Sequence, residues 1–310
     1  MMQWSPRSLR PGAPAVWLLL LGWLALVLPG TARQVPSRAA GTDSCAAHSR
    51  DEASHRTLLQ QAANVLRAQD AEMINFTWQE HESRQQVSGG ATIHSKDETW
   101  DISTIAGQQY KRLIARDGHP LTPDQQQEQQ KKLQAFIEDH EPQSAGDRAE
   151  QAQQRQKRLE REQRQQAALL HNFHFTLTGS RSTPWGKAWI IHATPIAGLN
   201  PSGKDARLMS HFAGDLWIEA SGCHLMRLDL TILDPVTFGW ILGKVDQGGH
   251  LLITFAPVDT ENWFPQHFSL QAQGRILFKH LDIHLRNDYF DYRRFQVESR
   301  ILPATPINDP

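Results

Sequence analysis

The sequence predicts a mainly β protein: a strongly curved antiparallel sheet, or half-open β-barrel, of about 11 strands with helices covering its concave side. After residue 172 the chain consists almost wholly of short runs in which apolar and polar residues alternate, the period of a half-buried strand. Polar turns separate these runs, which is typical of an antiparallel meander. A sheet this large curls, splits or closes, and helices expected at 51–67 and 122–140 can cover its apolar face.

The first 33 residues have the pattern of a signal peptide. Arg7 and Arg10 precede the apolar run Val16–Leu28, and small residues lead up to Ala32. The run is shorter than the roughly 20 residues of a membrane-spanning helix. We therefore expect cleavage near Ala32 and export to the periplasm, with an uncleaved anchor as the alternative. Residues 34–48 are small and polar, and we expect a disordered linker there.

A single domain is expected over residues 49–302, followed by a tail at 303–310. Its first element is a helix that begins at a capping box formed by Ser49 and Glu52 and ends at about Arg67. The helix has an apolar stripe that must lie against the sheet: Leu58, Leu59, Ala62, Val65 and Leu66. Three strands follow, near residues 74–79, 92–104 and 109–115.

A polar helical insert occupies residues 121–170. Thr122 caps its first helix and Pro123 takes the first helical position. That helix has one narrow apolar contact, made by Leu133, Phe136 and Ile137. A second, Gln-rich helix near 147–170 has almost no apolar stripe, so we do not expect a sustained coiled coil. We expect solvated helices lying on the sheet.

The remaining strands are expected near residues 173–177, 189–193, 211–220, 223–233, 249–258, 263–273, 275–285 and 289–301, with a turn at 200–203.

The stretch GDLWIEASGCHLMRLDL places Cys223 next to His224, which resembles a nucleophile beside its base. Adjacent side chains of an extended chain point to opposite faces, whereas a nucleophile and its base must approach within about 3 Å. The stretch therefore predicts a hairpin with its tip at Ser221-Gly222. Cys45 is the other cysteine, and in an exported protein the two cysteines allow a disulfide; two separate buried thiols are the alternative.

In that hairpin, Leu216 and Ile218 are expected on one face, with Trp217 on the other. The return strand should supply the apolar row Met226, Leu228 and Leu230, with Arg227 and Asp229 opposite.

The sequence predicts no metal, no cofactor and no nucleic-acid partner. His280, Asp282 and His284 alternate with apolar residues as the polar face of a strand, rather than as zinc ligands on a helix. The formal net charge of −1 lacks the basic excess that nucleic-acid binding requires.

Aromatic residues are spread over the expected strands, roughly one to each. They suit either a filled core or a cavity for an acyl chain or another apolar ligand. The cavity candidates are Trp78, Trp100, Phe175, Trp189, Trp217 and Leu228. Arg112 and Arg227 are candidates for orienting a carboxylate or phosphate head group.

Three segments resemble one family. YKRLIARDGHPLTPDQQQEQQKKL (110–133) resembles the strand–turn–helix of bacterial exported proteins related to the outer-membrane lipoprotein-sorting factors (LolA, LolB and RseB). The Cys223 hairpin is similar to their G-x-L-W-I-D strand and its partner. NWFPQHFSLQAQGRILFKHLDIHLRNDYFDYRRF resembles their W-x-P strand and closing strand. Together these segments cover about 73–301 and are most similar to uncharacterised, long-helix members.

The resemblance implies an unclosed β-barrel with a helical lid around an apolar cavity, which in that family holds acyl chains or senses envelope stress. We therefore expect a non-enzymatic periplasmic protein that binds a lipid, an acyl chain or a lipidated protein, with no membrane span after cleavage. An envelope-stress sensor or interaction module that uses the 121–170 helices to contact an envelope protein is the alternative. A thiol or metal-dependent enzyme is the third hypothesis.

Overall fold

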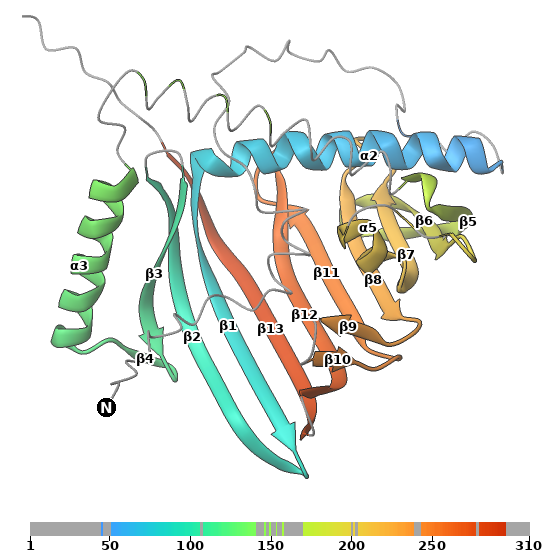
Figure 1. The fold of residues 1–310 in the computed structure, drawn as a ribbon. Coiled ribbons are helices and arrows are strands. Elements are labelled where there is room, and N and C mark those ends of the chain that lie inside the picture. Colours follow the sequence, from blue (N-terminus) through green and yellow to red (C-terminus); the bar gives the residue numbers. More distant parts are fainter. Residues whose placement is uncertain are drawn as a thin grey trace, which may run out of the picture.

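One large antiparallel sheet dominates the computed structural model, and the long helix α2 runs across it (Figure 1). The structure describes Cys45 and residues 51–105, 108–140, 170–199, 204–238, 243–276 and 279–295, with isolated positions at 146, 149, 153, 157 and 201. The expected signal peptide and tail lie outside these residues, as do the linker apart from Cys45 and nearly all of the second insert helix.

The helices are α2 (Glu52–Glu72), α3 (Pro123–His140) and α5 (Lys204–Met209), and a 3₁₀ helix, η1 (Met73–Asn75), directly follows α2. The strands are β1 (Phe76–Ser88), β2 (Ala91–Ile105), β3 (Gln108–Arg116), β4 (His119–Pro120), β5 (Phe173–Thr183), β6 (Gly186–Pro195), β7 (Phe212–Glu219), β8 (Leu225–Ile232), β9 (Val236–Phe238), β10 (Gly243–Val245), β11 (His250–Pro257), β12 (Trp263–Ile276) and β13 (Lys279–Arg294). The predicted mainly β class is confirmed.

Over the described residues the sheet has 13 strands, of which 11 follow one open path, β4-β3-β2-β1-β13-β12-β11-β8-β7-β6-β5. The other two lie off this path: β10 pairs with β12, and β9 pairs with β10. The predicted strong curvature and half-open barrel are wrong, because the sheet is neither closed nor strongly curled. Its edges, β4 and β5, lie at opposite ends of the path. Part of its apolar face is buried under α2, so the sheet does not have to fold onto itself to remove that face from water.

Helix α2 begins later and ends later than the sequence predicts. Its N-cap is Asp51, whose side chain accepts a hydrogen bond from the backbone N–H of Ser54 at 2.7 Å, and not a Ser49 capping box. The helix continues to Glu72 because Gln69 and Asp70 are buried rather than exposed. Polar residues at these two positions gave the sequence the pattern of a helix end.

The start of α3 follows its prediction. The Thr122 backbone N–H donates to the side chain of Gln125, and the Gln125 N–H donates back to Thr122 Oγ1 at 3.4 Å, a reciprocal cap. Phe136 packs on Tyr110 of β3 with ring centroids 4.8 Å apart. Helix α3 therefore lies against β3 near the edge of the sheet (Figure 1). The prediction that it covers a concave side is wrong.

Candidate functional site

An apolar cavity of about 180 Å³ lies between α2 and the sheet. Its lining residues on helices and before β5 are Leu59, Ala62, Ala63 and Leu66 of α2, Met209 of α5 and Leu170. The sheet contributes Phe173, Phe175, Ala193, Phe212, Leu216, Ile218, Leu225, Leu228, Leu230 and Ile253. Each of these side chains is hydrocarbon or thioether, so the cavity wall presents no side-chain group that would hold water.

The cavity is a direct consequence of the two periodicities in the sequence. Leu59, Ala62 and Leu66 recur every three or four residues and so share one face of α2. On β7, Leu216 and Ile218 alternate with outward residues and face that helix. Two alanines among the helix residues keep the helix side thin, which leaves unfilled space.

Two of the six predicted cavity residues line this cavity: Phe175 on β5 and Leu228 on β8. The other four do not. Trp78 is buried in the larger core cluster, where it stacks on Tyr292 with centroids 6.0 Å apart. The Trp100 ring has Lys96 and Lys111 over it at 5.2 and 5.4 Å, in the β1–β3 half of the sheet.

Trp189 and Trp217 lie near the cavity strands but have other partners. Trp189 donates its indole N–H to the Cys45 carbonyl at 2.9 Å. Trp217 packs with Trp263 and Met226 in a small separate cluster. Trp217 is on the other face of β7 from Leu216 and Ile218, whereas Trp189 pairs with Ile218 and packs against the α2 cluster beside the cavity without lining it.

Neither predicted head-group arginine has a free guanidinium. Arg112 pairs with Asp101 at 2.7 Å, and Arg227 pairs with Asp229 at 2.5 Å. Burial raises the pKa of Asp229, but hydrogen bonds from Arg227 and His250 outweigh it and hold the pKa below its usual value. Arg227 also lies over the Trp217 ring at 5.7 Å, away from the cavity residues of its strand.

The prediction for Met226 is wrong in one respect. The β7–β8 register shifts between Trp217 and Ile218, so Trp217 pairs with Arg227 whereas Ile218 pairs with Leu225. This bulge moves Met226 out of the cavity row and into the cluster with Trp217. Leu228 and Leu230 keep the predicted face and line the cavity.

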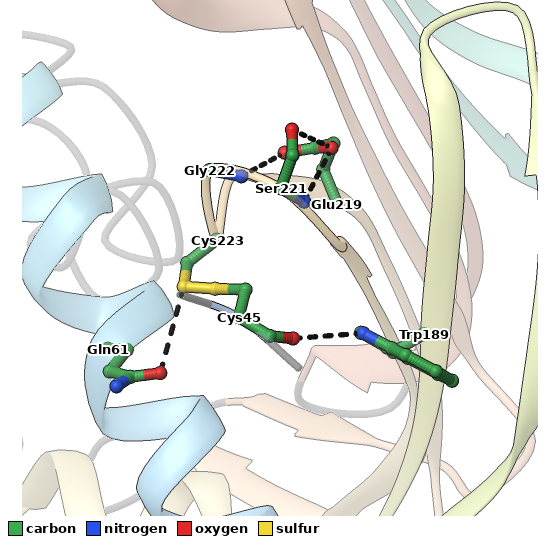
Figure 2. The surroundings of a disulfide bond; sticks show 7 residues. All are labelled: Cys45, Gln61, Trp189, Glu219, Ser221, Gly222 and Cys223. Carbon is green, nitrogen blue, oxygen red and sulfur yellow. Dashed lines mark hydrogen bonds between the residues drawn. A yellow bond between two sulfur atoms is a disulfide. The ribbon is translucent and has the colours of Figure 1, made fainter. Parts of the chain in front are cut away.

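A disulfide joins Cys45 to Cys223, with the two Cα atoms 5.3 Å apart (Figure 2). Cys223 has a positive φ of +60° in the turn after β7. Glu219 braces that turn by accepting hydrogen bonds from the Ser221 N–H and hydroxyl and from the Gly222 N–H. Because its sulfur is bonded, Cys223 is not available as a nucleophile.

The disulfide anchors the chain segment before α2 beside the cavity. Both cysteines belong to the buried cluster that contains Leu58, Leu59 and Ala62 of α2. The Cys223 sulfur lies 3.8 Å from the side-chain oxygen of Gln61 on the same helix (Figure 2). Cys45, within the linker expected at residues 34–48, is buried and bonded; the rest of that range lies outside the described residues.

Polar contacts fix both ends of α2, and the reasoning from the sequence did not identify them. Near its start, His55 contacts the Phe175 carbonyl through Nδ1 at 3.1 Å, and Arg56 donates to the Leu170 carbonyl at 2.8 Å. Near its end, the side-chain oxygen of Gln69 accepts a hydrogen bond from the backbone N–H of Trp263 at 2.9 Å. The signal that could have found Gln69 is its spacing, three residues after Leu66 on the stripe side of the helix.

The described residues show neither a grouped metal site nor a membrane-spanning helix. Within the described part of the chain, no three His, Cys, Asp or Glu side chains are grouped so as to hold a metal ion. His280, Asp282 and His284 lie on strand β13, as predicted. None of the described helices is long and apolar enough to span a membrane.

No model of a known protein family matches the chain. No curated protein matches its sequence. Among solved structures, the fold is similar to a domain described as an outer-membrane lipoprotein-sorting protein from Vibrio parahaemolyticus, with a TM-score of 0.33, 7% identity and coverage of 81% of this chain and 96% of that one. It is also similar to a LolA superfamily protein from Nitrosomonas europaea (TM-score 0.26, 9% identity, 78% and 94% coverage) and to a DUF1329 family protein from Desulfovibrio piger (0.30, 8%, 79% and 94%). The expected structural similarity to lipoprotein-sorting proteins is found, at low sequence identity.

Proposed function

We propose that this protein is a non-catalytic periplasmic carrier that holds an acyl chain of a lipid or lipoprotein in the cavity beneath α2. The observation that carries the proposal is the wholly apolar side-chain lining of that cavity. A ligand with polar groups would leave them unpaired there, whereas a hydrocarbon chain loses nothing on leaving water. The sequence resemblance to lipoprotein-sorting factors supports the same ligand class.

The size of the cavity sets what it holds with α2 in place. An apolar cavity of about 150 Å³ in another protein takes up one benzene molecule. The 180 Å³ here therefore suits a chain end of about six carbons. Burial of that many methylenes contributes about 5 kcal/mol before the entropic cost of binding. A longer acyl chain needs more room, which a shift of α2 away from the sheet would provide.

Two further features support the periplasmic location. The N-terminal sequence has the pattern of a signal peptide. The Cys45–Cys223 disulfide is typical of a protein that works in an oxidising compartment.

A pair of alanines on α2 provides the test. Ala63 lines the cavity, whereas Ala68 is exposed on the same helix. Ala63→Phe fills the cavity, and Ala68→Phe makes the same chemical change outside it. Titration with dansyl-labelled undecanoic acid should show a fluorescence rise for wild type and Ala68→Phe, and a binding constant weakened at least tenfold for Ala63→Phe. Equal binding by all three proteins would place the ligand elsewhere, and no binding by wild type would rule out the carrier function.

The alternative, an interaction module, is favoured by α3. None of the α3 side chains is buried, and its ring contact with the sheet runs through Phe136. Deletion of residues 121–170 should then abolish capture of an envelope partner while the sheet still folds. If the deletion variant still captures the same envelope partner as wild type and binds acyl chains equally well, this second function is excluded.

A further inference from the structure

Gln69 joins α2 to two other parts of the protein at once. Its side-chain oxygen accepts from the Trp263 N–H at 2.9 Å, and its nitrogen donates to the Glu261 carbonyl at 3.1 Å. The same nitrogen contacts His224 Nδ1 at 3.0 Å. Gln69 follows Leu66 by three residues on the face of α2 that lines the cavity, so these contacts hold the cavity-covering helix down.

These contacts fix the protonation state of His224. The Trp263 N–H is only a donor, so the atom of Gln69 facing it must be the oxygen, and the other atom must be the NH₂ group. One N–H of that group points to the Glu261 carbonyl and the other to His224. His224 Nδ1 must therefore carry a lone pair, which makes the ring the neutral tautomer with its proton on Nε2.

The surroundings of His224 hold its ring in place. The imidazole stacks on the Trp263 indole with centroids 5.0 Å apart and planes 9° apart. On the turn, a Cβ at Gly222 would lie 2.6 Å from the ring, so glycine is required there. A 180° flip of the ring would preserve the stack but would present Cδ2 to Gln69 in place of Nδ1, so the contact with Gln69 favours the orientation seen here.

We propose that the Gln69–His224 contact is a latch on α2, and that protonation of His224 releases the latch and opens the cavity to an acyl chain. A proton on Nδ1 would face the Gln69 N–H group, so donor would meet donor. Gln69 cannot flip to accept it without losing its bonds to Trp263 and Glu261. The proposal rests on the proposed carrier function, because it describes how that same cavity opens.

Charged groups of both signs lie on the elements around His224. The acids are Glu219 on its own hairpin, Asp70 and Glu72 on α2, and Asp259 and Glu261 on the loop between β11 and β12. The cations are Arg67 on α2 and Arg294 on β13, and Arg294 pairs with Glu72 and Asp259 at 3.7 Å. Burial lowers the pKa of His224 and outweighs the opposing pull of the Glu219 carboxylate. Since the latched state binds the proton less readily than a free imidazole, the latch is fully stable above the ordinary pKa of about 6.5. It weakens as the pH falls from there toward the lowered pKa.

Hydrogen exchange of the full-length protein, followed by mass spectrometry over residues 52–72, tests the latch without any ligand. In wild type, protection factors in the second half of α2 should fall by up to tenfold per pH unit below about 6.5. His224→Gln keeps an acceptor for Gln69 but cannot gain a proton, so its protection should not change between pH 7.5 and 5.5. Gln69→Leu should show low protection at both pH values.

His250→Gln is the matched control, because His250 pairs with Asp229 and is not part of the latch. It should keep the wild-type pH dependence of α2. Protection that is independent of pH in wild type, or that changes equally in His224→Gln, overturns the latch. If Gln69→Leu fails to fold, the His224→Gln comparison still decides.

Entry of the neutral dye N-phenyl-1-naphthylamine separates the latch from the carrier function. Faster entry at pH 5.5 than at pH 7.5 in wild type, but not in His224→Gln, supports both. If hydrogen exchange of α2 depends on pH but the protein takes up no dye at either pH, the latch is upheld and the carrier function is overturned. If the protein takes up dye but the hydrogen exchange of α2 does not change with pH, the carrier function is upheld and the latch is overturned.

Discussion

Removal of the Cys45–Cys223 disulfide should cost this protein a large part of its stability. The two cysteines are 178 residues apart in the sequence, so the bond closes an unusually long loop in the unfolded chain. The chain-entropy relation gives about 5 kcal/mol for a loop of that length at 25 °C. With a urea m-value of about 2.5 kcal/mol/M, the unfolding midpoint should fall by about 2 M.

The assay is urea unfolding of four proteins: wild type, Cys45→Ala, Cys223→Ala and the double variant. Each single change already breaks the bond, so all three variants should have similar midpoints, and reduced wild type should join them. Trp189→Phe is the control, because it removes the hydrogen bond to the Cys45 carbonyl and part of the ring that packs beside it, but leaves the disulfide intact. It should cost about 1–2 kcal/mol, less than loss of the disulfide. Identical midpoints for oxidised and reduced wild type would refute the reasoning.

Three further predictions concern Gly214, Leu230 and Asp229. Gly214→Ala should lower the urea midpoint strongly, because a Cβ there would lie 2.0 Å from the Asp229 carbonyl oxygen and Gly214 has a φ of +155°. Gly248→Ala is the control: nothing lies near its Cβ position, so it should cost only about 1 kcal/mol. Equal losses of stability in the two variants would contradict this. Leu230→Ala should cost about 2–5 kcal/mol by enlarging the cavity, measured against the exposed Leu233→Ala, which should lie within about 0.5 kcal/mol of wild type. Because the folded state lowers the pKa of Asp229, its carboxylate stabilises the fold above the ordinary pKa of about 3.9, and this stability is lost as the pH falls through the pKa of the folded state. Asp229→Asn should therefore flatten the acid limb of the plot of stability against pH. An unchanged acid limb would exclude the effect.

Where a pattern is local, the sequence was sufficient. The alternation that places Leu216 and Ile218 on one face is set by strand geometry, and the Thr122–Pro123 helix start is set by capping chemistry. The alternation fails at Met226 because a register shift against β7 depends on the partner strand, which a single strand does not encode.

The candidate site was only partly predictable for a related reason. Phe175 and Leu228 were found, but Trp189 and Trp217 were not distinguished from them. Trp217 is on the other face of its hairpin, and Trp189 is on the covered face but beside the cavity, which depends on how far along the sheet the cavity extends. Gln69 was not found because a polar residue on an apolar stripe has the same pattern as a helix end. Its role depends on Trp263, 194 residues away in the sequence.

The shape of the sheet was not predicted, because the number of strands alone favours curling. In the structure, α2 covers part of the apolar face of the sheet, and the sheet stays open. The sequence left the pairing of Cys45 with Cys223 open, because an exported chain with two cysteines allows either a bridge or two buried thiols; the structure has the bridge.

Native mass spectrometry of the full-length protein, purified from the cells that make it, tests the carrier account most directly. Wild type and Ala68→Phe should have a bound mass that fragments to an acyl lipid or lipopeptide, and Ala63→Phe should be empty. Consistently empty wild type that also takes up no lipid in vitro, or the same bound mass in Ala63→Phe, would contradict it.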